Sequence, residues 1–504
     1  MVESRKAAPP WPLGLMNMAR RPRPEKSAAK DTERKARRGK SAKGGRAIPS
    51  GLAARQVAAA LVRRILHEGT PLGEALARES GALEALSAPD RALAQNIART
   101  TLRRSGQLDE AIGRFVKKPL AKKAALARAI LRIGAAQVLF MRIPAHAAID
   151  TAVRLAKADA AARPLAGLIN AVLRNISRQS DGILKSQDAF ACNIPVWLRR
   201  NWIAAYGEHT ARRIASSLLK EPALDVTVKD PAQAARWAKA LDAHVLPTGS
   251  LRLDRGGRAI PSLPGFAQGA WWAQDAAAAL PVRLLGDIAG KRVLDMCAAP
   301  GGKTAQLAAA GAHVTALDMS ARRLERLREN LARLNLEADI VCADALTWQP
   351  ETPFDAIVLD APCTATGTAR RHPEVLHLKT PGQMTELMAL QGAMLERALG
   401  MLQPGGKLIY CVCSLQPQEG EMRIAQVLQD HADQVRRLPI AAQELAGQTQ
   451  MITPQGDLRT LPCMAIGEET GLDGFFAARL TRLQGRLATA PSWSRPFQDT
   501  KRAP

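Results

Sequence analysis

Two cysteines stand one residue apart where a predicted strand runs into a polar loop. The stretch KLIYCVCSLQPQEGE, residues 407–421, carries Cys411 and Cys413, and Ser414 follows them. Because side chains alternate along a strand, both thiols face the same side, with Cys411 inside the strand and Cys413 at its exit. Four uses are open: a metal site, a disulfide, core packing, or a nucleophile.

The number and spacing of the cysteines argue against two of these uses, a disulfide and a metal site. The chain has seven cysteines, an odd number, with no Cys-x-x-Cys spacing and no secretory signal: 192, 297, 342, 363, 411, 413 and 463. This predicts reduced thiols in a cytoplasmic protein rather than disulfides. The eight histidines show no ligand spacing, so we expect no metal.

The charge points to a polyanionic partner. The formal net charge is +25, which for a soluble protein favours nucleic acid, although a merely solvated basic surface remains the alternative. No apolar run approaches the ~20 residues that a membrane span needs. No signal peptide is recognisable, so we expect no membrane partner.

A regular alternation of apolar strands and helices must position the cysteines. From residue 275 the predicted strands are KRVLDMC, HVTALDM, ADIVCAD, FDAIVLDAP and GKLIYCVC, and DGFFAARLTRL adds a late one. Helical segments such as SARRLERLRENLARLN separate them. This alternation is typical of a Rossmann-like α/β domain, in which helices cover both faces of a parallel sheet.

The loop after the first of these strands has the form of a ligand-binding loop. DMCAAPGGKT, residues 295–304, leads from a strand through small residues into a helix. A Walker A loop is excluded because Cys297 stands where its first glycine belongs. A dinucleotide loop is excluded by Pro300. The remaining possibility is that this loop binds S-adenosylmethionine.

Acidic residues end the next strands in the chain. Asp318, Asp344 and Asp360 close three predicted strands, and ligands bind at the carboxyl ends of parallel strands. Asp318 is placed to take ribose hydroxyls and Asp344 to bind an adenine ring. A single aspartate at such a position is more often a helix cap or a turn residue than a ligand contact. The three together favour a cofactor site.

The remaining chain divides by composition into further parts. Residues 1–50 carry 14 Lys/Arg against 4 Asp/Glu and are predicted to form a disordered basic arm, within which Met18 offers another start. Residues 52–182 have helical periodicity throughout, with Ser87 as a predicted N-cap. The other predicted parts are a small α+β module at 190–255, the α/β domain at 256–482, and a tail at 483–504.

The three motifs together resemble a known family. DAPCTATGTARRHPE (360–374), DMCAAPGGKT and CVCSLQPQEGE are similar to those of RNA (cytosine-C5)-methyltransferases, above all the bacterial Sun/Fmu type that acts on 16S rRNA. The segment 52–182 resembles the NusB-like RNA-binding domain of that type, including LINAVLRN. The likeness covers roughly residues 52–482.

The resemblance implies a role for each matching residue. Cys413 would be the nucleophile, Cys363 would assist product release, and Asp360 would contact cytosine and cofactor. The implied S-adenosyl-L-methionine pocket comprises Cys297, Ala298, Ala299, Pro300, Gly301, Gly302, Lys303, Asp318, Asp344 and Asp360. Val412 departs from the family, which has Thr there. Two roles remain open for Lys303: a lysine on the protein surface, or a residue that contacts the ligand.

The resulting hypothesis is methyl transfer to C5 of a cytosine in RNA through a covalent cysteine–C6 adduct, by a monomer. The same chemistry on tRNA, and a non-catalytic RNA-binding factor, are the alternatives. Arg370 and Arg371 are expected near the RNA phosphates. Arginines between the helical stripes of 52–182, Arg103 among them, are either RNA-facing or simply solvated.

Overall fold

The computed structural model describes residues 50–253 and 259–484. The predicted basic arm, apart from its last residue, and nearly all of the predicted tail lie outside these residues. Among the described residues, no helix combines the length and apolarity needed to cross a bilayer.

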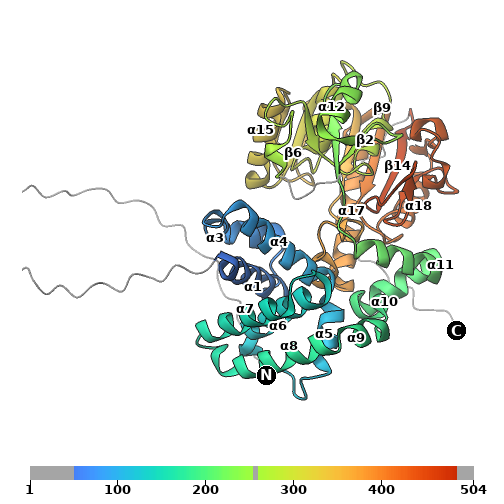
Figure 1. Ribbon diagram of the computed structural model, residues 1–504. Helices are drawn as coiled ribbons and strands as arrows, with labels where there is room; N and C mark the ends of the chain where they lie inside the picture. The colour runs from blue at the N-terminus through green and yellow to red at the C-terminus, as the bar shows by residue number, and fades with distance from the viewer. Residues whose placement is uncertain (1–49, 254–258, 485–504) are drawn as a thin grey trace, which may run out of the picture. The chain divides into compact units, whose positions relative to one another are not determined.

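The first part of the described chain is helical, as its periodicity predicts (Figure 1). Its helices are α1 (Ser50–Glu68), α2 (Leu72–Arg78), α3 (Ser80–Glu84), α4 (Ala88–Arg103), α5 (Ser105–Gly113), α6 (Ala125–Phe140), α7 (Ala145–Ala158), α8 (Ala166–Arg178), α9 (Ser180–Ser186), α10 (Ala189–Asn193) and α11 (Val196–Leu218). Val57, Leu61 and Ile65 of α1 are buried, and they pack with α4, α6 and α8 in one apolar cluster. The predicted cap is confirmed, because the Asp90 amide donates to Oγ of Ser87 at 3.3 Å.

A small antiparallel sheet follows. Its strands are β1 (Leu224–Val228), β2 (Ala243–Val245), β3 (Leu251–Leu253) and β4 (Trp271–Ala273), in the order β2-β3-β1-β4, with α12 (Ala234–Leu241) between β1 and β2. The Trp271 side chain is fully buried in the core of this sheet. The sheet therefore takes its last strand from beyond residue 255, from the segment that leads into the α/β part.

The larger sheet has the order β10-β14-β9-β8-β5-β6-β7. Its five parallel strands are β5 (Arg292–Met296), β6 (His313–Asp318), β7 (Asp339–Cys342), β8 (Phe354–Asp360) and β9 (Leu402–Val412). The late strand β14 (Phe475–Arg482) is antiparallel to β9, and it pairs with β10 (Val435–Arg437) and β11 (Leu458–Thr460). The sheet is thus mixed, with a parallel centre. A short two-stranded ribbon, β12 (Ala465–Ile466) and β13 (Glu469–Thr470), lies outside it.

Helices cover both faces of the larger sheet, as the strand pattern predicts. They are α13 (Leu280–Arg283), α14 (Gly302–Ala309), α15 (Ala321–Leu334), α16 (Val375–Leu378), α17 (Pro381–Met401) and α18 (Glu421–Asp430). Along β9, Ile409 and Cys411 pack into one apolar cluster, while Tyr410 and Val412 pack into another with α17 and α18. The confirmed alternation makes Cys411 a buried core residue, and Val412 fills the opposite core instead of supplying a hydroxyl beside Cys413.

Side chains of the helical part contact the segment that follows β8. Arg103, at the end of α4, is buried, and its Nη2 donates to the carbonyl oxygen of Arg370 at 2.9 Å. Nε2 of His377 lies 2.9 Å from the carbonyl oxygen of Leu102 and 3.1 Å from Oγ of Ser105. Arg103 is therefore a structural contact, which excludes the RNA-facing alternative for this arginine.

Candidate active site

The sheet brings two cysteines together that are far apart in the chain. Cys363 lies three residues after β8, and Cys413 directly follows the neighbouring strand β9. Because Asp360 is in register with Cys411, the two strands end at the same level. Sγ of Cys363 lies 3.6 Å from Sγ of Cys413, and the Gly367 amide donates to the Cys413 carbonyl at 3.0 Å.

The surroundings of Cys363 and of Cys411 favour the protonated thiol. The hydrogen bond with Cys413, followed by burial, raises the pKa of Cys363 well above its usual value. Either thiol can donate in the hydrogen bond that joins the two sulfurs. Cys413 is only half-buried, whereas burial raises the pKa of the enclosed Cys411 well above its usual value. Of the three thiols, Cys411 is fully enclosed, whereas Cys363 and Cys413 are both half-buried at the edge of the sheet.

The glycine-containing loop after β5 folds back against β6. Backbone amides of Cys297 and Ala298 both donate to the Leu317 carbonyl, at 2.9 and 3.0 Å. Gly301 is the N-cap residue before α14 and has a φ of 101°, and a Cβ on it would lie 2.9 Å from Cγ of Leu327. Glycine is therefore required there. Burial raises the pKa of the Cys297 thiol to about 12, so this thiol stays protonated.

Asp318 and Asp344 end up in different surroundings. Asp318 is buried at the end of β6, where its carboxylate accepts the Ala299 amide at 3.2 Å and the Ser320 amide at 2.9 Å. Asp344 follows β7, is exposed, and accepts the Leu346 amide at 2.9 Å. Asp318 thus holds the glycine-containing loop in place. Asp344 instead stabilises the turn that follows β7, through its hydrogen bond with the Leu346 amide.

Lys303 is not a surface lysine. Its side chain is 9% exposed and its Nζ lies 2.7 Å from Oδ2 of Asp360 and 5.1 Å from the ring centroid of Phe475. Burial alone would lower the pKa of Lys303, but the Asp360 carboxylate outweighs it and raises this pKa above its usual value. The α14 start therefore brings a fixed positive charge to the end of β8, close to Cys411, whose Sγ is 3.8 Å from Oδ1 of Asp360.

Asp295 is a candidate binding residue that the sequence motifs did not single out. It is fully buried at the end of β5, where Oγ1 of Thr304 donates to its Oδ2 at 2.6 Å. Its Oδ1 has no hydrogen-bond partner within the described residues. Burial raises the pKa of this carboxyl to about 6. A buried acceptor without a partner calls for a donor from a ligand.

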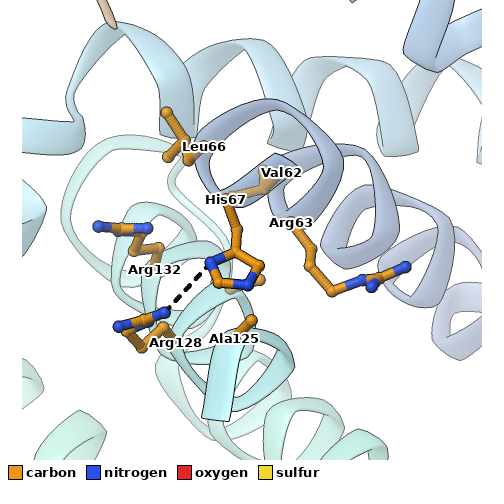
Figure 2. A pocket seen from close by; sticks show the side chains of 8 residues that line it. Val62, Arg63, Leu66, His67, Ala125, Arg128 and Arg132 are labelled. Carbon is orange, nitrogen blue, oxygen red and sulfur yellow. Dashed lines mark hydrogen bonds between the residues drawn. The ribbon is translucent and has the colours of Figure 1, made fainter. Parts of the chain in front are cut away.

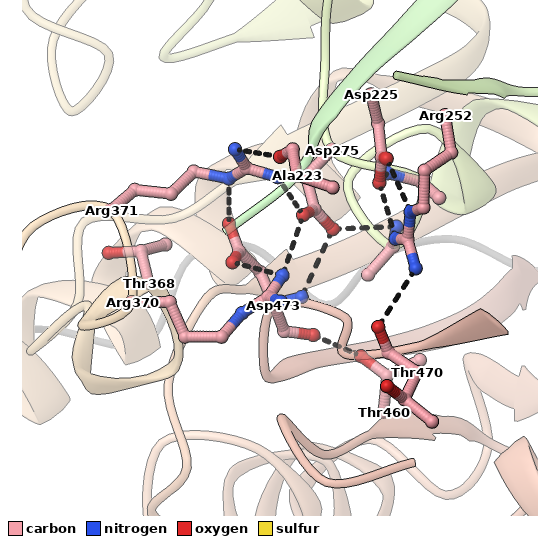
Figure 3. Close-up of polar contacts among 12 residues, drawn as sticks. Ala223, Asp225, Arg252, Asp275, Thr368, Arg370, Arg371, Thr460, Thr470 and Asp473 are labelled. Atoms are coloured by element: carbon pink, nitrogen blue, oxygen red, sulfur yellow. Dashed lines mark hydrogen bonds and ion pairs between the residues drawn. The ribbon is translucent and has the colours of Figure 1, made fainter. Parts of the chain in front are cut away.

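Arg370 and Arg371, which we expected near the RNA phosphates, both form ion pairs within the protein. Both guanidinium groups contact the same two buried carboxylates, those of Asp275 and Asp473, as Figure 3 shows. The shortest contact joins Nη2 of Arg371 to Oδ2 of Asp275 at 2.6 Å. Arg370 is 5% exposed. The pair neutralises carboxylates that fold against it from distant parts of the chain, so neither is free for a phosphate.

A second basic feature lies in the helical part. A cavity of about 190 Å³ between α1 and α6 is lined by Arg63, His67, Arg128 and Arg132, among others (Figure 2). Nη2 of Arg128 lies 3.4 Å from Nδ1 of His67. Within the described residues, no group of three or more His, Cys, Asp or Glu side chains is arranged to hold a metal ion.

Comparison with known proteins identifies both parts of the chain. Residues 282–481 match the family model described as "16S rRNA methyltransferase RsmB/F", and residues 52–178 match that of the NusB family. The chain is 35% identical over 448 residues to the "Ribosomal RNA small subunit methyltransferase B" of Erwinia tasmaniensis, covering 85% of this chain and 98% of that protein. The protein of the same name from Serratia proteamaculans is also 35% identical, with the same shares covered.

A solved structure supports the fold over nearly the whole described chain. The crystal structure of PH0851 superimposes with a TM-score of 0.65 at 21% identity, over 86% of this chain and 99% of that one. The resemblance seen in the sequence motifs, and the predicted combination of a NusB-like helical part with a Rossmann-like methyltransferase part, are confirmed.

Proposed function

The chain belongs to the family of ribosomal RNA small subunit methyltransferase B, and from this premise we propose that it methylates C5 of a cytosine in 16S rRNA through a bond between Cys413 and C6. The general activity, S-adenosyl-L-methionine-dependent methylation of RNA, follows from membership of this family. The observation that carries the finer proposal is the 3.6 Å separation of the Cys363 and Cys413 sulfurs at the carboxyl edge of the sheet.

The residues at this edge fit the cofactor. When bound, S-adenosyl-L-methionine supplies a methyl group on a positively charged sulfur. Its ammonium, sulfonium and ribose hydroxyls match a site with carboxylates at the ends of four strands: Asp295, Asp318, Asp344 and Asp360. The unpartnered Oδ1 of Asp295 is a suitable acceptor for the ammonium. The loop from Cys297 to Lys303 would hold the cofactor through its backbone and the α14 N-terminus.

Cys413 would begin the reaction. Its thiolate adds to C6 of the cytosine, and electron density then builds at C5, the atom that accepts the methyl group. Asp360, held by Lys303, would contact the cytosine edge and stabilise the charge that develops in the ring. A cytosine must leave its stack to reach this edge, which favours unpaired RNA.

Cys363 would complete the reaction. After methylation, loss of the C5 proton and of the Cys413 sulfur restores the aromatic ring. The hydrogen bond with Cys413 is the largest cause of the raised pKa of Cys363. Once the Cys413 sulfur is bonded to C6, this cause is lost, so Cys363 becomes easier to deprotonate when a base is needed.

We propose that the helical part contacts the RNA. Between Ala111 and Ile149 there is no Asp or Glu but there are eight Lys or Arg. Four of these lysines, Lys117, Lys118, Lys122 and Lys123, are exposed and lie in the segment between α5 and α6, close in sequence to Arg128 of the basic cavity. A surface of this charge attracts phosphates without reading sequence. The predicted boundaries at 52–182, 190–255 and 256–482 remain part of this proposal, except that the small module also includes β4 (Trp271–Ala273). A monomer and a cytoplasmic location are proposed as well.

Methyl transfer to isolated RNAs tests the proposal. The full chain and labelled S-adenosyl-L-methionine are incubated with naked 16S rRNA, assembled small subunits and tRNA, and nucleosides are identified by mass spectrometry. We expect 5-methylcytidine in 16S rRNA, no transfer by Cys413→Ala, and a stable RNA–protein adduct with Cys363→Ala. Label in tRNA alone would support the tRNA alternative, and full activity of Cys413→Ala would exclude the covalent route.

A further inference from the structure

We propose that Glu419 is a positioning residue that sets the placement of the Cys363 and Cys413 sulfurs by holding the residue that follows each of them. Glu419 lies in the loop between β9 and α18 and is fully buried. The inference rests on the proposed function for its consequence in catalysis, but its geometric basis does not depend on the substrate.

Both cysteine-bearing loops are hydrogen-bonded to this one carboxylate. Thr364, directly after Cys363, donates its backbone amide to Oε1 at 2.9 Å and its hydroxyl to Oε2. Ser414, directly after Cys413, donates its hydroxyl to the same Oε2. The two hydroxyl oxygens lie 3.1 Å apart. Because both donors are immediate neighbours of the thiols, displacing Glu419 releases the two loops from each other.

The carboxylate is itself fixed from the other side. Nε2 of Gln391, on α17, donates to Oε1 at 3.1 Å and also to the Pro362 carbonyl at 2.8 Å. The hydroxyl of Tyr410, on β9, donates to the Glu419 carbonyl at 2.6 Å. Glu419 therefore connects α17, the end of β9 and the Cys363 loop.

The hydrogen bonds at this site require a carboxyl group, with two acceptor oxygens, rather than an amide. A buried carboxylate is tolerated only where hydrogen bonds replace its water, and Glu419 accepts four. No Lys, Arg or His forms an ion pair with it among the residues that the structure describes. A glutamine of the same size would present an NH₂ group to one pair of donors, so one loop would lose its acceptor.

The charge also acts on Cys363 directly. After the hydrogen bond with Cys413, burial and the charge of Cys413, the Glu419 carboxylate is the fourth cause that raises the pKa of Cys363. Replacing Glu419 by Gln removes that charge without changing the side-chain size. The titration of Cys363 thus reports on Glu419 in the absence of RNA and cofactor.

The test compares Glu419→Gln with Glu396→Gln in the full chain. Glu396 is a partly buried carboxylate on α17 that contacts His431 instead of the cysteine loops, at 2.6 Å, so it controls for the chemical change. Two measurements are made: the pH profile of Cys363 alkylation, followed at the peptide level, and the rate of adduct formation with RNA that contains 5-fluorocytidine, whose C5 cannot release a proton.

We expect Glu419→Gln to shift the Cys363 profile to lower pH and to slow adduct formation at least tenfold, while Kd for S-adenosyl-L-methionine changes less than twofold. Glu396→Gln should match the wild type. An unshifted Cys363 profile together with wild-type adduct formation would overturn the proposal. If the wild type forms no adduct at all, the proposed function fails while the alkylation profile still tests Glu419. Should Glu419→Gln not fold, the pair Thr364→Val and Ser414→Ala removes two donors instead and must slow adduct formation.

Discussion

Nζ of Lys303 lies 2.7 Å from Oδ2 of Asp360, and this ion pair joins the first turn of α14 to the end of β8. The contact connects the proposed cofactor loop with the proposed cytosine-binding carboxylate. A lysine that is 9% exposed and held in this way orients its partner. The proposed catalytic edge of the sheet therefore contains a cation that the first turn of α14 supplies.

Replacing Lys303 by Met should lower kcat by about 100-fold, the cost typical of losing one fixed charge at a reaction centre. Asp360 would lose its ammonium partner and its orientation. Steady-state methylation measures kcat, and calorimetry measures cofactor binding separately. The control is Lys291→Met, an exposed lysine before β5, which should keep wild-type kcat. Equal activity of both variants would contradict the role of the ion pair.

Cofactor affinity should depend on pH through Asp295. Its folded-state pKa of about 6 lies above the ordinary carboxyl value, so the native protein retains a proton that the unfolded chain releases. The stability that Asp295 supplies is thus full below about pH 4 and is lost as pH rises through about 6. A cationic ligand binds the ionised form, so the affinity for S-adenosyl-L-methionine should fall as pH drops below 6, by up to about tenfold per unit.

Calorimetry between pH 5 and 7.5 measures this dependence. Asp295→Asn should bind more weakly at pH 7.5, and its affinity should change little with pH. A wild-type affinity that stays constant over the same range would show that Asp295 does not bind the ammonium group.

Replacing Arg371 by Met should destabilise the fold by about 3–5 kcal/mol, because it removes one partner of a buried ion-pair cluster. Asp275 and Asp473 would keep only Arg370 as a cationic partner within the described residues. Urea unfolding measures the change. Arg154→Met is the control, since Arg154 forms a solvent-exposed pair with Asp150 at 3.8 Å and should change stability by less than about 1 kcal/mol.

Replacing Lys117, Lys118, Lys122 and Lys123 together by Ala should weaken RNA binding and make it less salt-dependent. Each lost phosphate contact lowers the slope of log affinity against log salt by roughly 0.7–0.9. Filter binding at several salt concentrations measures both effects. Arg326→Ala with Arg328→Ala, two exposed positions on α15, serves as a comparison. A similar loss in both variants would indicate general charge attraction without a defined face.

Local pattern predicted most of the fold and part of the site. Strand ends and the glycine-containing loop depend on nearby residues, so Asp318 and Asp360 could be placed in advance. The roles of Cys363 and Cys413 came only from the resemblance to the family. The role of Glu419 could not be predicted, although this residue lies in the same stretch as Cys413. Its carboxylate oxygens accept hydrogen bonds from residues that are 5, 28 and 55 positions away in the sequence. The neighbouring Ser414 and Thr364 offered only a weak signal, a hydroxyl after each cysteine.

Charge proved the least reliable guide to position. Arg370 and Arg371 resemble a phosphate-binding pair in the sequence, yet their carboxylate partners lie about 100 residues away on either side. A sequence shows how many positive side chains exist, but only the folded chain shows which are already neutralised. For Lys303, likewise, burial rather than spacing decided between surface and site.

The hydrogen bond from Arg103 to the Arg370 carbonyl gives the helical part a structural role in addition to its proposed contact with RNA. Deletion of residues 50–186 would remove this hydrogen-bond donor from the segment that follows Cys363. A truncated chain without these helices should therefore have a lower kcat even at saturating RNA. The deletion would disturb the loop that carries Cys363, in addition to weakening RNA binding.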